Sequence, residues 1–221
     1  MTPEEKIAKA KLRMVLDRPF WATLALRRKY RAAARGKTFE TDGQMIAYHR
    51  PFVEKLDVEE VEGVIAHELC HIVMLHHLRR GGRDPKKWNY ACDYAINPRL
   101  VADGFKLPRG GLIDPQFDGM SAEQIYSLLP DGDELTAMVG DIGAGMGEVL
   151  DGDPDSEMEV NSEMLTAVAA GKAAGALPGF AEELGLPVNP ALVRTLYQRT
   201  FIDGGKGQLK QARAVFNELA I

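Results

Sequence analysis

Apolar side chains recur at helical spacing between residues 57 and 80. This spacing predicts an amphipathic helix with one buried face. Asp57 and Glu60 fit a capping box at its start, and Arg79 and Arg80 suit its C-terminal end. Because Gly81 follows directly, we predict one continuous helix over residues 57–80. The apolar positions that share its face are Val61, Val64, Ile65, Leu69, Ile72 and Leu75.

Capping residues and helix-breaking residues predict further helices on both sides of this one. Beyond about residue 156, turn residues separate three or four more segments that we expect to be helical. The four expected in the first 130 residues are a helix after Thr2 with Glu5 completing a capping box, a helix over about 19–34, a helix from Asp84 to about 102, and a short helix capped by Ser121 and Gln124.

A change to shorter, β-prone runs occurs at KTFETDGQMIAYH. The Asp42-Gly43 pair lies between two such runs and is typical of a hairpin turn. We therefore predict strands near 37–41 and 44–48. Together with the helices, this hairpin predicts a mostly helical chain with one small sheet.

Composition narrows the class of protein. The 221 residues are 45% hydrophobic and 27% charged, with a formal net charge of −5, which are values of a globular protein without a general affinity for nucleic acid. No apolar run is long enough to cross a bilayer, and the charged N-terminus does not have the pattern of a secretory signal. Two cysteines make no disulfide framework. We expect a cytoplasmic protein with no membrane partner.

Charge is distributed unevenly along the chain. Residues 1–40 carry eleven Lys or Arg against four Asp or Glu, which we interpret as solvated helix faces rather than a nucleic-acid surface. Residues 131–165 carry eleven acids and no Lys or Arg. We therefore expect a domain over 1–130, an acidic, Gly-rich flexible connector over 131–156, and a helical segment over 157–221. The connector could also lie across the basic helices or over a cleft as an inhibitory segment.

The predicted helix over 57–80 contains His67-Glu68-Leu69-Cys70-His71, an HExxH motif. Two histidines at i and i+4 lie about 40° apart around a helix, so both can reach one zinc ion. Glu68 then lies beside the open metal position, where it can take a proton from water. The motif predicts His67 and His71 as metal ligands and Glu68 as the catalytic base.

A third protein ligand is expected, and three candidates are open. In a continuous helix His77 points about 120° away from His71, and His76 about 140° away, which argues against both. Asp93 on the following helix is the better candidate, because an antiparallel helix would bring its carboxylate back to the metal. Asn97 lies at i+4 from Asp93 and could hydrogen-bond the outer nitrogen of a ligand imidazole.

These segments resemble the bacterial metallopeptidase domain that often precedes a von Willebrand factor A-like domain. The likeness covers roughly residues 18–130, and is carried by RPFWATLAL, TDGQMIAYHRPFVEKL, the HExxH helix with RDPKKWNYACDYAIN, and GMSAEQIYSLLP. It implies a zincin-like α+β fold, metal and catalytic roles for His67, Glu68 and His71, and Asp93 as third ligand. It also implies that the strand near 44–48 is the cleft's edge strand, to which a peptide could add.

The sequence thus predicts a zinc-dependent metallopeptidase that acts on a peptide or protein substrate, with Zn²⁺ as its cofactor. The alternative is a non-catalytic module of the same fold that binds a partner protein and uses zinc for stability. The intact HExxH favours the enzyme, because a structural zinc site has no use for Glu68.

Overall fold

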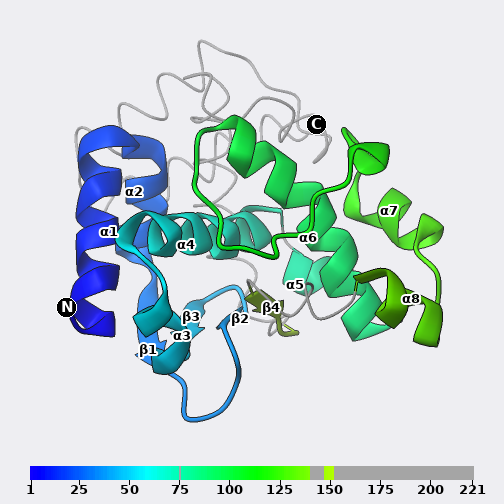
Figure 1. The fold of residues 1–221 in the computed structure, drawn as a ribbon, viewed down its shortest axis with the longest axis horizontal. Helices are drawn as coiled ribbons and strands as arrows, with labels where there is room; N and C mark the ends of the chain where they lie inside the picture. The colour runs from blue at the N-terminus through cyan, green and yellow to red at the C-terminus, as the bar shows by residue number, and fades with distance from the viewer. Residues whose placement is uncertain (75, 140–146, 152–221) are drawn as a thin grey trace, which may run out of the picture. The chain divides into compact units, whose positions relative to one another are not determined.

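The computed structural model describes residues 1–74, 76–139 and 147–151 (Figure 1). They all belong to the first of two compact units, Met1–Gly152 and Asp153–Ile221. The strands are β1 Lys29–Ala32, β2 Phe39–Thr41, β3 Met45–Tyr48 and β4 Gly147–Val149. The helices are α1 Pro3–Asp17, α2 Pro19–Arg27, α3 Arg50–Lys55, α4 Val58–Val73, α5 His76–Arg79, α6 Pro85–Ala102, α7 Ala122–Leu128 and α8 Gly132–Val139, with a 3-10 turn at Pro115–Phe117.

The four strands form one sheet in the order β1-β3-β2-β4. The predicted hairpin is confirmed: β2 and β3 are antiparallel, with Phe39 opposite Tyr48 and Thr41 opposite Ile46. Asp42 Oδ1 accepts hydrogen bonds from the backbone N–H groups of Gln44 and Met45, which closes the turn. β1 pairs with β3, and β4 pairs with β2, both in parallel.

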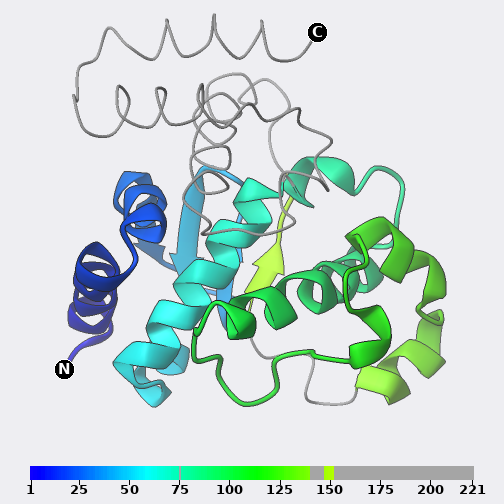
Figure 2. The same cartoon turned by 90° about the horizontal axis from the view of Figure 1, so that it is seen from above.

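Helix α4 crosses the middle of the described fold, with α1 and α2 on one side and α6 on the other (Figures 1 and 2). It also packs against β2 and β4. Its capping box is present as predicted, with Asp57 and Glu60 each accepting from the other's backbone N–H. Thirteen of its side chains or glycine positions are buried, so the helix that carries the HExxH motif lies in the core rather than on the surface.

Two predicted helices end earlier than expected. The helix expected over 19–34 stops at Arg27, and residues 29–32 instead form β1, whose partner β3 lies far along the chain. The helix expected over 57–80 ends at Val73, with Met74 as C-cap, and α5 begins at His76. The angles that a continuous helix would give His76 and His77 therefore do not apply.

Two further expectations are corrected in part. Residues 132–139 and 147–149, placed by composition in a flexible connector, form α8 and β4. The strand near 44–48 is not the edge strand of the cleft, because β3 is paired on both sides and β2 is paired with β4.

The helical segment expected over 157–221 lies outside the described residues. Among the described helices, none is long and apolar enough to cross a membrane.

Candidate metal centre

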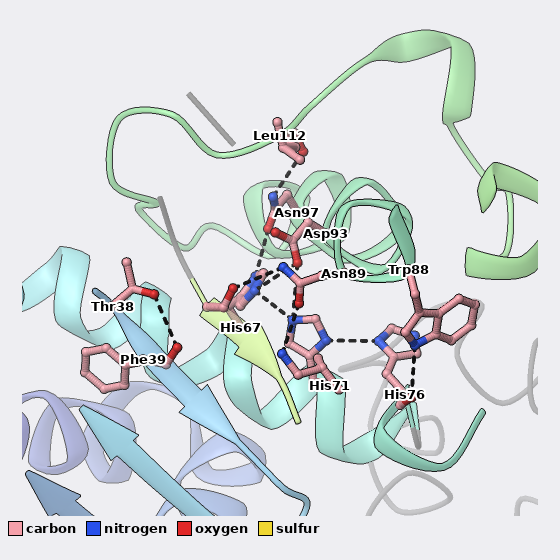
Figure 3. Close-up of polar contacts among 12 residues, drawn as sticks. Thr38, Phe39, His67, His71, His76, Trp88, Asn89, Asp93, Asn97 and Leu112 are labelled. Carbon is pink, nitrogen blue, oxygen red and sulfur yellow. Dashed lines mark hydrogen bonds and ion pairs between the residues drawn. The ribbon is translucent and has the colours of Figure 1, made fainter. Parts of the chain in front are cut away.

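The two histidines of the HExxH motif, His67 and His71, lie at the contact between α4 and α6 (Figure 3). His67, Glu68 and His71 are completely buried. At one end of the contact, His67 hydrogen-bonds Asn97 in the second half of α6. At the other end, the Trp88 indole near the start of α6 donates to the carbonyl of His76, which follows α4. The two helices therefore run in opposite directions where they meet, which was the arrangement expected to bring Asp93 back to the motif.

Asn97 selects the tautomer of neutral His67. Its side-chain nitrogen donates to the carbonyl of Leu112 over 3.0 Å, so its oxygen faces His67 Nδ1 at 2.9 Å. That oxygen can only accept, so in the neutral ring Nδ1 carries the hydrogen and Nε2 has the free lone pair. This is the tautomer a metal ligand needs, with the outer nitrogen held by an amide oxygen.

His71 is oriented by His76, one of the two histidines expected to lie away from the site. The Nδ1 atoms of His71 and His76 are 3.1 Å apart, and both rings are completely buried. His77 is also buried, yet its imidazole packs against Gly43 in the β2–β3 turn. The structure therefore brings His76 beside a proposed ligand and leaves His77 outside the cluster.

Asp93 completes a tight triangle of ligand atoms. The Nε2 atoms of His67 and His71 are 2.8 Å apart, and Asp93 Oδ1 is 3.4 Å from each. Four ligands around zinc at 2.0–2.1 Å would be about 3.3 Å from one another. The three atoms are thus close to the separations that a single tetrahedral ion requires, and the donor set of two imidazoles and one carboxylate suits zinc.

Three carboxylate oxygens of this cluster are buried without a hydrogen bond among the described residues. They are both oxygens of Glu68 and Oδ1 of Asp93, which lies 3.4 Å from each imidazole Nε2. Glu62, one and a half turns earlier on α4, is also buried but is paired with Arg13 and Arg18 at 2.9 and 3.1 Å. Since an unpaired buried carboxylate is costly, the contrast indicates a cation at the cluster.

Burial dominates the proton equilibria here. It raises the pKa of Glu68 well above its usual value, and the nearby charges of Asp93 and Glu40 add to the effect. Burial, reinforced by His67, lowers the pKa of His71 to about 4. For Asp93, burial opposes ionisation, but His67 and His71 outweigh it and lower its pKa. Near neutral pH His71 is therefore neutral and Asp93 ionised, which are the forms that bind metal.

A second group of buried ligand types comprises His71, His76 and Cys92. It shares His71 with the first group, and in it His71 Nδ1 already contacts His76. The group of His67, His71 and Asp93 has the only carboxylate of the two, which makes it the better candidate for holding a divalent ion. Cys70 is buried and belongs to neither group.

The sequence analysis did not predict two residues that lie near the site, Asn89 and Gly147. Asn89 binds β4, with its nitrogen 3.2 Å from the carbonyl of Gly147 and its oxygen 3.0 Å from the N–H of Val149. A helical signal for it existed, because Asn89, Asp93 and Asn97 follow one another at intervals of four. Gly147 lies against Glu68, and nothing local in the sequence indicates that contact.

Residues 2–178 match a family model described as "Putative metallopeptidase domain". The chain belongs to this family. No curated protein and no solved structure matches the chain. Membership of this metallopeptidase-domain family supports a metal-dependent peptidase and implies a metal cofactor. The buried group of His67, His71 and Asp93 supplies candidate ligands for it.

Proposed function

We propose that the protein is a zinc-dependent metallopeptidase of zincin type. His67, His71 and Asp93 hold the ion, and Glu68 is the catalytic carboxylate. The observation that carries this proposal is the buried triangle of two Nε2 atoms and one carboxylate oxygen, with the unpartnered carboxylate of Glu68 beside it. The expected substrate is a peptide or a protein.

The side chains of this site have separate tasks. When bound, zinc supplies Lewis acidity, which polarises a peptide carbonyl and lowers the pKa of water from about 15.7 to about 7. Glu68 accepts the proton of the attacking water and passes it to the departing amine. Its burial helps, because a raised pKa brings a carboxylate closer to the pH at which it can both take and return a proton. Asn97 and His76 hold the outer nitrogens of the two imidazoles.

The alternative is a non-catalytic module in which zinc serves stability. Asn97, His76 and Asp93 would have the same roles in such a module. Glu68 would not, because burying a carboxylate with neither a hydrogen bond nor an ion pair destabilises a fold that gains nothing from it. This difference favours the enzyme and makes Glu68 the residue on which the two functions are best separated.

Metal content tests the ligand set first. We expect one equivalent of zinc per purified wild-type chain and a large loss in Asp93→Ala. Glu62→Gln is the control, because Glu62 is also a buried acid of the core but pairs with Arg13 and Arg18 rather than with the histidines. Full zinc retention in Asp93→Ala would overturn the proposed ligand set.

Peptide hydrolysis then tests catalysis. Glu68→Gln keeps the size of the side chain and removes the base, so we expect it to retain zinc and to lose at least about 100-fold in the rate of hydrolysis. The assay uses zinc-loaded wild type and Glu68→Gln on a mixed peptide library, with products identified by mass. Equal, chelator-insensitive rates in both proteins, or no hydrolysis by either, would favour the non-catalytic module.

A further inference from the structure

Strand β4 covers the proposed catalytic carboxylate with the chain's own backbone. A methyl group at Gly147 would overlap Glu68 Oε1 and would lie 3.2 Å from His67 Cδ2. Gly147 is the register partner of Phe39, a buried residue on the face of β2 that packs on α4. The strand therefore passes over Glu68 and His67 at backbone distance, and Figure 3 shows β4 running beside His67.

Both edges of β4 are hydrogen-bonded. On one edge it pairs with β2, and the pairing continues to the N–H of Leu150, which donates to the carbonyl of Thr41 over 2.9 Å. On the other edge the amide of Asn89 donates to the carbonyl of Gly147 and accepts from the N–H of Val149. The side-chain amide of Asn89 thus makes the two backbone hydrogen bonds that a neighbouring strand would make. Such contacts recognise any extended backbone, regardless of its side chains.

A carboxylate fixes the C-terminal end of this segment. Asp151 accepts two hydrogen bonds from Arg80, over 2.7 Å from Nε and 2.5 Å from Nη2. Arg80 is itself held by a hydrogen bond to the carbonyl of Arg83. Such a two-point contact selects a planar acidic group at one position along the bound strand. A pocket of about 650 Å³ borders β4. The exposed side chains of Lys37 and Lys86 line it and add positive charge beside the strand.

Two features of β4 oppose its pairing with β2. The strand has only three residues, and Glu148 is the register partner of Glu40, so two carboxylates lie side by side. Burial and the charge of Glu148 both raise the pKa of Glu40, which reflects that repulsion. Like charges directly opposite each other destabilise a strand pair.

We propose that the groove between β2, Asn89 and Arg80 is a binding site for an extended peptide with an acidic side chain at the place of Asp151, and that residues 147–151 are its resting occupant. A substrate and β4 cannot occupy the groove together, because both would lie over Glu68. That occupying the groove blocks hydrolysis rests on the proposed peptidase activity. The experiment below measures peptide binding, which does not depend on that activity.

Gly147→Ala is the variant that empties the groove. It changes no group of the groove or of the metal cluster, yet its methyl group has no room above Glu68. Gly82→Ala is the matched control, since a methyl group there would meet nothing within 4 Å. Asp151→Asn is a second variant that loosens the segment without adding bulk, in case Gly147→Ala does not fold.

Two measurements are made on the zinc-loaded full chain. The first is hydrogen exchange at residues 147–151, which we expect to become at least about tenfold faster in Gly147→Ala and Asp151→Asn than in wild type and Gly82→Ala. The second is fluorescence anisotropy with a labelled, end-blocked Gly-Glu-Val-Leu-Asp peptide. We expect about tenfold tighter binding by Gly147→Ala than by wild type, and about three- to tenfold weaker binding of the peptide that ends in Asn.

The outcomes separate this proposal from the peptidase itself. Unchanged exchange and unchanged peptide affinity in both opening variants would overturn the proposed groove, as would equal binding of the Asp and Asn peptides. Faster exchange and tighter binding without any hydrolysis would support the groove and overturn the peptidase. Loss of the gained affinity in Gly147→Ala/Asn89→Ala, with zinc content unchanged, would support Asn89 as the residue that binds the peptide backbone.

Discussion

His76 is a fully buried imidazole that acts on the candidate metal site through its contact with His71. Its Nδ1 faces His71 Nδ1 at 3.1 Å, while its backbone carbonyl accepts from Trp88. If His71 Nε2 is to bind metal, His71 Nδ1 carries the hydrogen and donates it to His76. His76 therefore holds the ring of His71 in both the tautomer and the orientation of a ligand.

Replacing His76 tests that role at a single side chain. We expect His76→Leu to weaken zinc binding by about 10- to 100-fold, because His71 loses the acceptor that fixes its ring. Competition with a chromophoric chelator measures the affinity. His77→Leu is the matched control, since His77 is the next residue, is also buried, and packs against Gly43 instead. Equal zinc affinities for the two variants would contradict the role assigned to His76.

At the scale of elements, the position of α4 depends on close contact with the loop after α6. A methyl group at Gly63 would overlap the backbone carbonyl of Lys106 and approach the side chain of Leu107 at 3.3 Å. The same loop is tied to the start of α4, where Lys106 pairs with Asp57. Gly63 therefore lets α4 and this loop approach at backbone distance, about one helical turn before His67.

We expect Gly63→Ala to destabilise the fold by about 1 to 3 kcal/mol, the usual cost of added volume where backbone cannot move aside. For a chain of this size that lowers the melting temperature by roughly 2 to 12 °C. Thermal unfolding followed by circular dichroism measures it. Gly82→Ala should melt within about 2 °C of wild type, because its methyl group meets open space. Equal melting temperatures for Gly63→Ala and this control would contradict the expectation and would mean that the loop at Lys106 can move aside at little cost.

Elements with local signals were predictable. The capping boxes at Thr2, Asp57 and Ser121 are all present, and the helix from Asp84 and the hairpin at Asp42 lie where expected. These features depend on residues within four positions of one another. The same is true of the i, i+4 spacing that put Asp93 and Asn97 on one side of α6.

Elements fixed by distant partners were not predictable. Residues 29–32 and 147–149 are strands because they pair in parallel with β3 and β2, and such partners leave no local pattern. The end of α4 at Val73 moved His76 beside His71, which a continuous helix forbids. The contact of Gly147 with Glu68 likewise joins residues 79 positions apart, so no motif within either segment indicates it.

At the scale of the whole described unit, the metal cluster joins two parts of the core. His67 and His71 come from α4, which packs on α1, α2 and the sheet, whereas Asp93 comes from α6, which packs on α7. Tyr94, Ala95 and their neighbours on α6 form a separate apolar cluster with α7 and α8. An ion at the triangle would cross-link these parts and would neutralise Asp93, whose Oδ1 is buried without a hydrogen bond.

Metal binding should therefore raise the stability of the unit. At free zinc about 100 times its dissociation constant, linkage gives about 2.7 kcal/mol, or a rise in melting temperature of roughly 5 to 11 °C over the chelator-treated protein. Glu68→Gln should show the same rise, because Glu68 is no ligand in the proposed site. Asp93→Ala should lose most of it, and magnesium should not replace zinc, since it prefers an all-oxygen octahedral shell. Calorimetry of the three proteins with zinc, with magnesium and with chelator measures these differences. An equal rise in Asp93→Ala would mean that the ion stabilises the fold from another place.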